Sequence, residues 1–157
     1  MKFAEQQIDG VYLIEPEPYK DERGMLRRHF CQNEFADFGL MTEIKQTNIS
    51  ENKKMHTLRG FHFQYPPHGE NKVISCVKGS IYDIVVDLRK ESKTFMKWQS
   101  FDLTEENRLS IYVPQGCANA YLTLQDNAWI LYYHSEFYAS GGEGGVCYND
   151  PLFKFHW

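Results

Sequence analysis

The residues best able to carry out chemistry stand together in residues 57–64, Thr-Leu-Arg-Gly-Phe-His-Phe-Gln. Arg59 is a permanent cation, and His62 carries an imidazole, the side chain whose ordinary pKa of about 6.5 allows proton transfer near neutral pH. Side chains alternate between the two faces of a strand. His62 and Gln64 therefore share a face with Gly60, whereas Arg59 lies on the other face unless a bend at Gly60 brings it round.

Further polar residues occur within apolar strands. Lys72 shares a strand face with Ile74 and Cys76, and Asp83 shares one with Val85. A buried charge without a partner is costly, so these residues lie either on a solvent face or in a paired network inside the protein. Other polar residues on strands or at their ends favour the network, and they are His62, Gln64, Asn119, Tyr132 and Tyr138.

Short strands separated by turns must position these side chains. A helix is predicted over residues 33–40 with Asn33 as its cap, Gly79 marks a hairpin, and residues 141–145 form a flexible loop. The pattern indicates an all-β sandwich or barrel, such as a jelly roll, with one or two short helices. The expected strands are 11–14, 25–30, 44–50, 57–64, 72–77, 81–88, 97–103, 108–113, 118–124 and 128–134.

Length and composition narrow the class of protein. The chain has 157 residues, the size of one ordinary domain, and we expect residues 1–157 to form one. A net charge of −4 provides no basic surface for DNA or RNA. No stretch is apolar enough for a signal peptide or a membrane span, so we expect a cytoplasmic protein. No CxxC pair suggests zinc or a disulfide among Cys31, Cys76, Cys117 and Cys147.

A series of segments spread along the chain follows one family pattern. They are residues 21–24, 57–64, 85–89, 114–121 and 148–151, with Tyr132, Tyr138 and the closing Trp157. Their order and spacing resemble the nucleotide-sugar 3,5-epimerases, the dTDP-4-dehydrorhamnose 3,5-epimerase family. The resemblance implies a cupin-type jelly roll (double-stranded β-helix) and a homodimeric isomerase without metal or cofactor. It also implies a nucleotide diphosphate sugar as substrate, in deoxysugar synthesis for surface polysaccharide.

The residues themselves argue against the metal site found in other cupins. Such sites use a His-x-His pair, a nearby glutamate and a further histidine after a Pro-x-Gly turn. Here Gln64 takes the second position of the pair, and Asn119 takes the last position. Exchanging two ligands for amides removes most of the affinity for a metal. His68 and Glu70 are expected to be solvated residues of a proline-rich loop.

An epimerase of this kind needs three groups around the sugar. The C4 ketone acidifies the hydrogens on C3 and C5, so a base, a group that stabilises the enolate oxygen, and an acid on the opposite face suffice. The resemblance implies that His62 is the base, that Lys72 holds the enolate oxygen and that Tyr132 is the acid. Tyr138 is expected to line the pocket.

The nucleotide end needs groups that bind a diphosphate. Arg23 and Arg59 match the phosphate-contacting arginines of the family, and Gln46 and Asn48 match polar positions near the nucleotide. Many family members have a glutamate where Arg28 stands. An arginine suits a base that presents acceptors, such as cytosine or guanine, better than it suits thymine N3–H.

Two departures from the family pattern affect the catalytic site. The family has a histidine where Asn119 stands. In the family, an aspartate after the closing tryptophan orients the histidine base, whereas the sequence here ends at Trp157. Either that segment is missing, or Asp83 orients His62 instead, or activity is reduced or restricted to one carbon.

Two other functions remain open at this point. A nucleotide-sugar ketoisomerase has the same fold and a histidine base, but it moves the ketone to C3. A binding protein that keeps the pocket without catalysis is suggested by Asn119 and by the absent aspartate. The position at which solvent deuterium enters the sugar distinguishes these functions from epimerisation.

Overall fold

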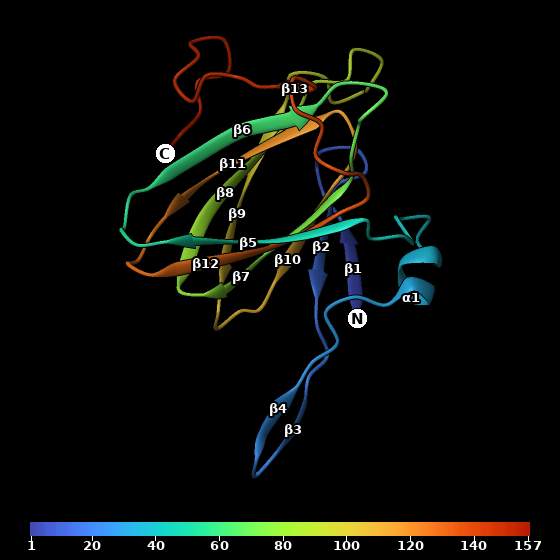
Figure 1. Ribbon diagram of the computed structural model, residues 1–157, viewed down its shortest axis with the longest axis vertical. Helices are drawn as coiled ribbons and strands as arrows, with labels where there is room; N and C mark the ends of the chain where they lie inside the picture. Colours follow the sequence, from blue (N-terminus) through green and yellow to red (C-terminus); the bar gives the residue numbers. More distant parts are fainter.

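The computed structural model describes residues 1–157 and consists mainly of two antiparallel β-sheets that face each other (Figure 1). The six-stranded sheet has the order β1 (Lys2–Glu5), β2 (Tyr12–Glu15), β10 (Ser110–Val113), β7 (Lys72–Lys78), β12 (Ala128–His134), β5 (Gln46–Asn52). The five-stranded sheet has the order β13 (Glu143–Gly144), β6 (Leu58–Gln64), β11 (Cys117–Thr123), β8 (Ser80–Asp87), β9 (Trp98–Thr104). The expected jelly roll is thereby confirmed.

Two smaller elements stand beside the sheets. Strands β3 (Tyr19–Asp21) and β4 (Gly24–Leu26) form a hairpin that projects away from the body of the molecule, as Figure 1 shows. The helix α1 (Gln32–Ala36) is shorter than the predicted 33–40. Its N-cap is Cys31, without a side-chain hydrogen bond, so the expected Asn33 cap is wrong. No helix is long and apolar enough to cross a bilayer.

Most strands occur where the alternation predicts them, with four exceptions, the first of which is the unexpected strand β3 of the hairpin. The expected strand 25–30 is reduced to β4, because the chain leaves the hairpin after Leu26. The glycine-rich loop 141–145 contains β13, which pairs with the end of β6. Strand β1, at the N-terminus, pairs with β2 and was not expected.

Apolar side chains fill both the space between the sheets and their outer surfaces. Ile74 and Ile111 of one sheet meet Ile81 and Val85 of the other in the central cluster. Lys72 and Asp83 share the inner faces with these residues, and both are buried. The charged residues noted in the sequence therefore lie inside the protein, not on a solvent face.

An extra residue in β6 decides which of its side chains face inward. His62 pairs with Asn119 of β11, but Arg59 pairs with Tyr121, so three steps along β6 match two along β11. This bulge reverses the alternation, and Arg59 and His62 line the same pocket although they are three positions apart in the strand. Phe61 is buried on the outer face instead. Of the two alternatives that the sequence left open for Arg59, the structure shows the one in which an irregularity at Gly60 brings it round to the face of His62.

Gly60 is required at this bulge for two reasons. Its φ is +117°, and a Cβ built on it would lie 2.5 Å from the Cα of Ala120 and from the backbone oxygen of Asn119.

We expect Gly60→Ala to lower the free energy of unfolding by about 2–4 kcal/mol, measured by urea denaturation. Gly39→Ala, at φ +67° with nothing within 4 Å, is the control and should cost about 1–2 kcal/mol. Equal losses would contradict the steric argument.

Candidate active site

A pocket of about 590 Å³ opens between the two sheets, within the size range of small-molecule sites. One wall comes from β5, β7 and β12, and the other comes from β6 and β11. The pocket brings together eight of the ten residues expected to act on substrate: Gln46, Asn48, Arg59, His62, Lys72, Asn119, Tyr132 and Tyr138.

His62 is exposed, whereas Lys72 and Asn119 of the same pocket are buried. It lies on β6 directly opposite Asn119, and its ring makes no hydrogen bond within the chain. Its main-chain oxygen accepts a hydrogen bond of 3.1 Å from Nζ of Lys72. The backbone of the expected base and the expected enolate-binding cation are therefore linked, although they belong to different sheets.

Lys72 forms an ion pair with Glu70 inside the pocket. The Nζ–Oε1 distance is 3.2 Å, and the two side chains are 8% and 9% exposed. The other oxygen of Glu70 lies 2.7 Å from Nδ1 of His134. Burial works to raise the pKa of Glu70, but the His134 hydrogen bond and the Lys72 charge outweigh it and hold that pKa below its usual value. The expectation that Glu70 is a solvated loop residue is wrong.

Tyr132 and His134 project from the same face of β12 because they are two residues apart. Their rings stack with centroids 5.8 Å apart and an angle of 17° between the planes. Tyr132 also packs against the central apolar cluster. Burial raises the pKa of Tyr132 well above its usual value, so the phenol carries its proton at neutral pH.

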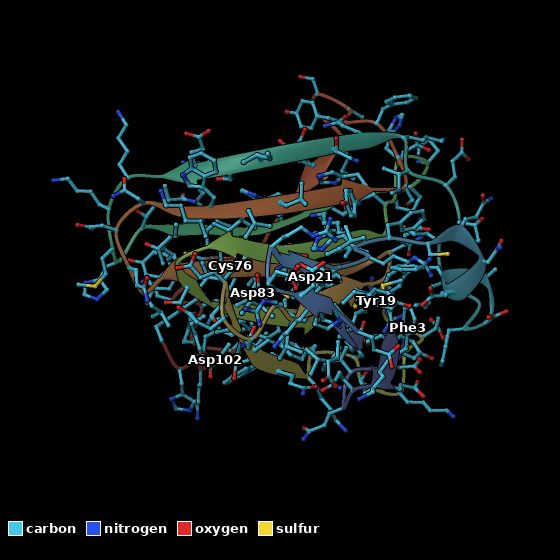
Figure 2. The ribbon with its side chains drawn as sticks, turned by 90° about the horizontal axis from the view of Figure 1, so that it is seen from below. Phe3, Tyr19, Asp21, Cys76, Asp83 and Asp102 are labelled. Atoms are coloured by element: carbon cyan, nitrogen blue, oxygen red, sulfur yellow. The ribbon has the colours of Figure 1, made fainter.

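Asp83 on β8 is a neighbour of Asn119 on the adjacent strand β11, but it does not line the pocket. Its side chain is completely buried, and its Oδ2 accepts a hydrogen bond of 3.1 Å from Nδ2 of Asn119. Oδ1 has no partner. Figure 2 labels Asp83 within the body of the molecule. Asp83 makes no hydrogen bond to His62, so the idea that it orients the base is wrong for this structure.

The rim of the pocket is held by side-chain amides. Asn52 accepts a hydrogen bond of 2.7 Å from Nε of Arg59. Gln64 donates to the backbone oxygens at 68 and 137 and accepts from the backbone nitrogen of Ala139. Gln64 thus fastens the loop that carries Tyr138, whose hydroxyl donates to Glu143.

Arg23 and Arg28 lie outside this pocket. Arg23 belongs to the turn of the β3–β4 hairpin and pairs with Asp21, and Arg28 follows the hairpin and pairs with Glu34. Figure 2, in which Asp21 and Tyr19 are labelled, looks at this hairpin from below the molecule. Within one chain, the structure does not bring these two arginines to the residues expected to bind the nucleotide.

Sequence reasoning missed two pocket residues that have a clear signal. His134 follows Tyr132 by two residues in the same strand, so the two side chains had to lie on the same face. Glu70 precedes Lys72 by two residues and shares its face in the same way. No group of three or more histidine, cysteine, aspartate or glutamate side chains is arranged to hold a metal ion.

The burial of Asp83 makes stability depend on pH. Burial raises the pKa of this carboxyl well above its usual value, so ionisation disfavours the folded state as pH rises above about 4. We expect Asp83→Asn to gain stability relative to the wild type between pH 4.5 and pH 8, reaching about 1–3 kcal/mol in urea denaturation. Asp102→Asn on β9, where the side chain is exposed, is the control. If the difference in unfolding free energy between Asp83→Asn and the wild type did not change with pH, the argument would be contradicted.

Comparison with known proteins agrees with this geometry. Residues 5–157 match the family model described as dTDP-4-dehydrorhamnose 3,5-epimerase. The enzyme of that name from Shigella flexneri is 34% identical, with 100% of this chain and 87% of the relative covered. The crystal structure of the Elizabethkingia anophelis enzyme has a TM-score of 0.96 at 35% identity, covering 100% of this chain and 86% of that chain.

A second solved structure is related but differs in its named activity. A 3′-monoepimerase from Streptomyces bikiniensis, in complex with dTDP-quinovose, has a TM-score of 0.90 at 32% identity, covering 97% of this chain and 77% of that chain. Since the family model covers nearly the whole chain and relatives above 30% identity align along its length, this protein belongs to the dTDP-4-dehydrorhamnose 3,5-epimerase family of isomerases.

Proposed function

We propose that this protein is an epimerase of a nucleotide-linked 4-keto-6-deoxyhexose that inverts C3, C5 or both. The observation that supports it most is that His62, Lys72 and Tyr132 converge on one pocket from two opposed sheets. Residues 1–157 are proposed to act as one catalytic domain in the cytoplasm. No step of the proposed reaction uses a cofactor.

The proposed reaction follows from where the three groups stand. His62, on the five-stranded sheet, removes a proton next to the C4 ketone. Lys72, on the six-stranded sheet, stabilises the negative charge that develops on the C4 oxygen. Tyr132, also on the six-stranded sheet, returns a proton to the other face of the sugar, and the raised pKa of its phenol keeps that proton available. Asn119 is proposed to contact the sugar near the C4 oxygen.

The nucleotide is proposed to lie at the rim. Arg59 is held through Nε by Asn52, which leaves its terminal nitrogens for phosphate oxygens. Gln46 and Asn48 on β5 provide polar contacts beside it, and Tyr138 lines the opening. The dTDP-sugar complex of the Streptomyces bikiniensis relative supports a nucleotide sugar as ligand. Arg28 is proposed to face the base and to favour acceptors on it.

A homodimer is proposed to complete the nucleotide site. The hairpin leaves Tyr19 81% and Leu26 73% exposed, and these two residues are partners across its strands, so they form a neighbouring pair of large exposed side chains of the kind that marks an interaction surface. Arg23 and Arg28 lie on and next to this hairpin, outside the pocket of their own chain. A second copy that receives the hairpin at its pocket would bury the apolar residues and supply both arginines.

The base is tested by hydrogen exchange in heavy water. We expect the wild type to incorporate deuterium at C3, C5 or both of a dTDP-, CDP- or GDP-4-keto-6-deoxy sugar, measured by NMR. His62→Asn should slow this exchange about 10²- to 10⁴-fold, because proton abstraction loses its base. His56→Asn is the control, since His56 is exposed and its φ of +62° suits asparagine.

Other outcomes of the deuterium-exchange experiment would contradict the proposal or favour a different function. Unchanged exchange in His62→Asn would refute the assignment of the base. A product with its ketone at C3 would favour the ketoisomerase. Binding of a nucleotide sugar without any exchange in the wild type would favour a binding protein. The nucleotide sugar that gives the fastest exchange identifies the preferred nucleobase. A clear preference for the dTDP sugar would remove the proposed role of Arg28.

The shared site is tested by mixing two inactive variants. The His62→Asn variant keeps Arg23 on its hairpin, and the Arg23→Ala variant keeps the base His62. If the hairpin crosses to the other copy, a mixed dimer has one complete site, in which one copy supplies His62 and the other supplies Arg23. We expect sedimentation to show a dimer and random mixing to restore about a quarter of wild-type activity, since about half of the dimers are mixed. A monomer, or mixed dimers without recovery, would contradict the proposal.

A further inference from the structure

A continuous line of hydrogen bonds runs along the pocket wall from the residues proposed to face the nucleotide to the backbone of the proposed base. It joins, in order, Gln46, Asn48, His134, Glu70, Lys72 and His62. Two of its members, His134 and Glu70, have no part in the proposed reaction. Their position in the middle of the line raises the question of what they do.

The outer half of the line crosses from β5 to β12. Nε2 of Gln46 donates to Oδ1 of Asn48 at 3.2 Å, and Nδ2 of Asn48 lies 3.4 Å from Nε2 of His134. The register of the two strands sets these contacts, because Gln46 is directly opposite His134 and Asn48 is opposite Tyr132. The amide of Asn48 is therefore oriented by a neighbour at each end.

The inner half of the line is centred on the carboxylate of Glu70. Oε2 accepts from Nδ1 of His134 at 2.7 Å, and Oε1 pairs with Nζ of Lys72 at 3.2 Å. The same Nζ donates to the backbone oxygen of His62 at 3.1 Å. Glu70 and its two partners are all enclosed, with side-chain exposures of 9% for Glu70, 8% for Lys72 and 13% for His134. The low exposure makes each of these contacts hard to replace with water.

The donors and acceptors of the line determine where the proton of His134 lies. An amide nitrogen can only donate, so Nε2 of His134 is the acceptor from Asn48. Nδ1 then carries the ring proton and donates it to Glu70. The carboxylate accepts from His134 on one oxygen and from Lys72 on the other, as an ionised group can, and its lowered pKa agrees with this.

A glutamine could not perform the same task. Its side chain has one oxygen that accepts and one nitrogen that donates. Neither the ammonium of Lys72 nor the protonated Nδ1 of His134 accepts a hydrogen bond, so one of the two links must break. The two-sided contact therefore requires the carboxylate itself and not merely a polar group of its size.

We propose that Glu70 is a positioning residue that, through His134, couples the nucleotide end of the pocket to Lys72. A ligand that contacts Gln46 or Asn48 moves the acceptor side of His134, and the carboxylate transmits the change to the lysine that stabilises the enolate. The placement of the ligand rests on the proposed function, whereas the line of hydrogen bonds belongs to the free protein.

The tautomer of His134 in the free protein provides the first test. We expect ¹⁵N NMR of the histidine rings to show the proton of wild-type His134 on Nδ1. In Glu70→Gln we expect a substantial share of the Nε2–H tautomer, because the acceptor at Nδ1 is lost. Glu136→Gln is the matched control, since it removes a glutamate that pairs with Lys45 outside the pocket. A tautomer that Glu70→Gln leaves as in the wild type would overturn the proposal.

The response to dTDP provides the second test. In the wild type and in Glu136→Gln we expect binding of dTDP to shift the ¹⁵N resonance of Nζ of Lys72. In Glu70→Gln the nucleotide should still bind, but the Lys72 shift should be lost. A Lys72 shift of the same size in both variants would overturn the coupling.

Kinetics separate positioning from substrate binding. We expect Glu70→Gln to lower kcat about 10- to 100-fold through misplacement of Lys72, with KM changed little. Combining it with His134→Asn should cost no more than Glu70→Gln alone, because both act through one line. An unchanged kcat, or additive losses, would count against the proposal. If the wild type turns over no nucleotide sugar, the proposed function fails, and the tautomer of His134 still decides the role of Glu70.

Discussion

The extra residue in β6 is the constraint on which the pocket depends. Without it, the strict alternation of a strand would send Arg59 and His62 to opposite faces of the sheet. The bulge lets both residues line the pocket while Phe61 stays in the apolar cluster outside the sheet. Only glycine fits at Gly60, because β11 passes too closely for any side chain. The local backbone at one residue thus decides which groups meet in the site.

Once the pocket exists, its charged residues must be paired with one another. The inner faces that hold the apolar core also hold Lys72 and Asp83, and buried charges are tolerated only with hydrogen-bonding partners. Glu70 pairs with Lys72, and Asn119 donates to Asp83. Oδ1 of Asp83 stays without a hydrogen-bond partner, as do Nε2 of His29 and Nε of Arg108 outside the pocket.

The two ends of the site depend on different parts of the fold. The proposed sugar end is built from strand residues whose neighbours in the sheet hold them in place, and these residues come together within one chain. The expected nucleotide end includes Arg23 and Arg28, which lie on and beside a projecting hairpin with large exposed apolar side chains. In the proposed function, the sheets therefore carry the catalytic groups, and the projecting hairpin carries part of the nucleotide-binding site.

Much of this architecture could be predicted from the sequence, because it depends on local rules. Alternation located the central strands, placed Lys72 on the same face as Ile74, and allowed a bend at Gly60. The order of the motifs identified the family. Other features depend on pairing between distant segments, which alternation does not contain. The partner of Asp83, the burial of Glu70 and its contact with His134 were decided only when β7, β8, β11 and β12 came together. The tertiary structure settled these because the cost of a buried charge depends on which groups the fold brings within hydrogen-bond reach.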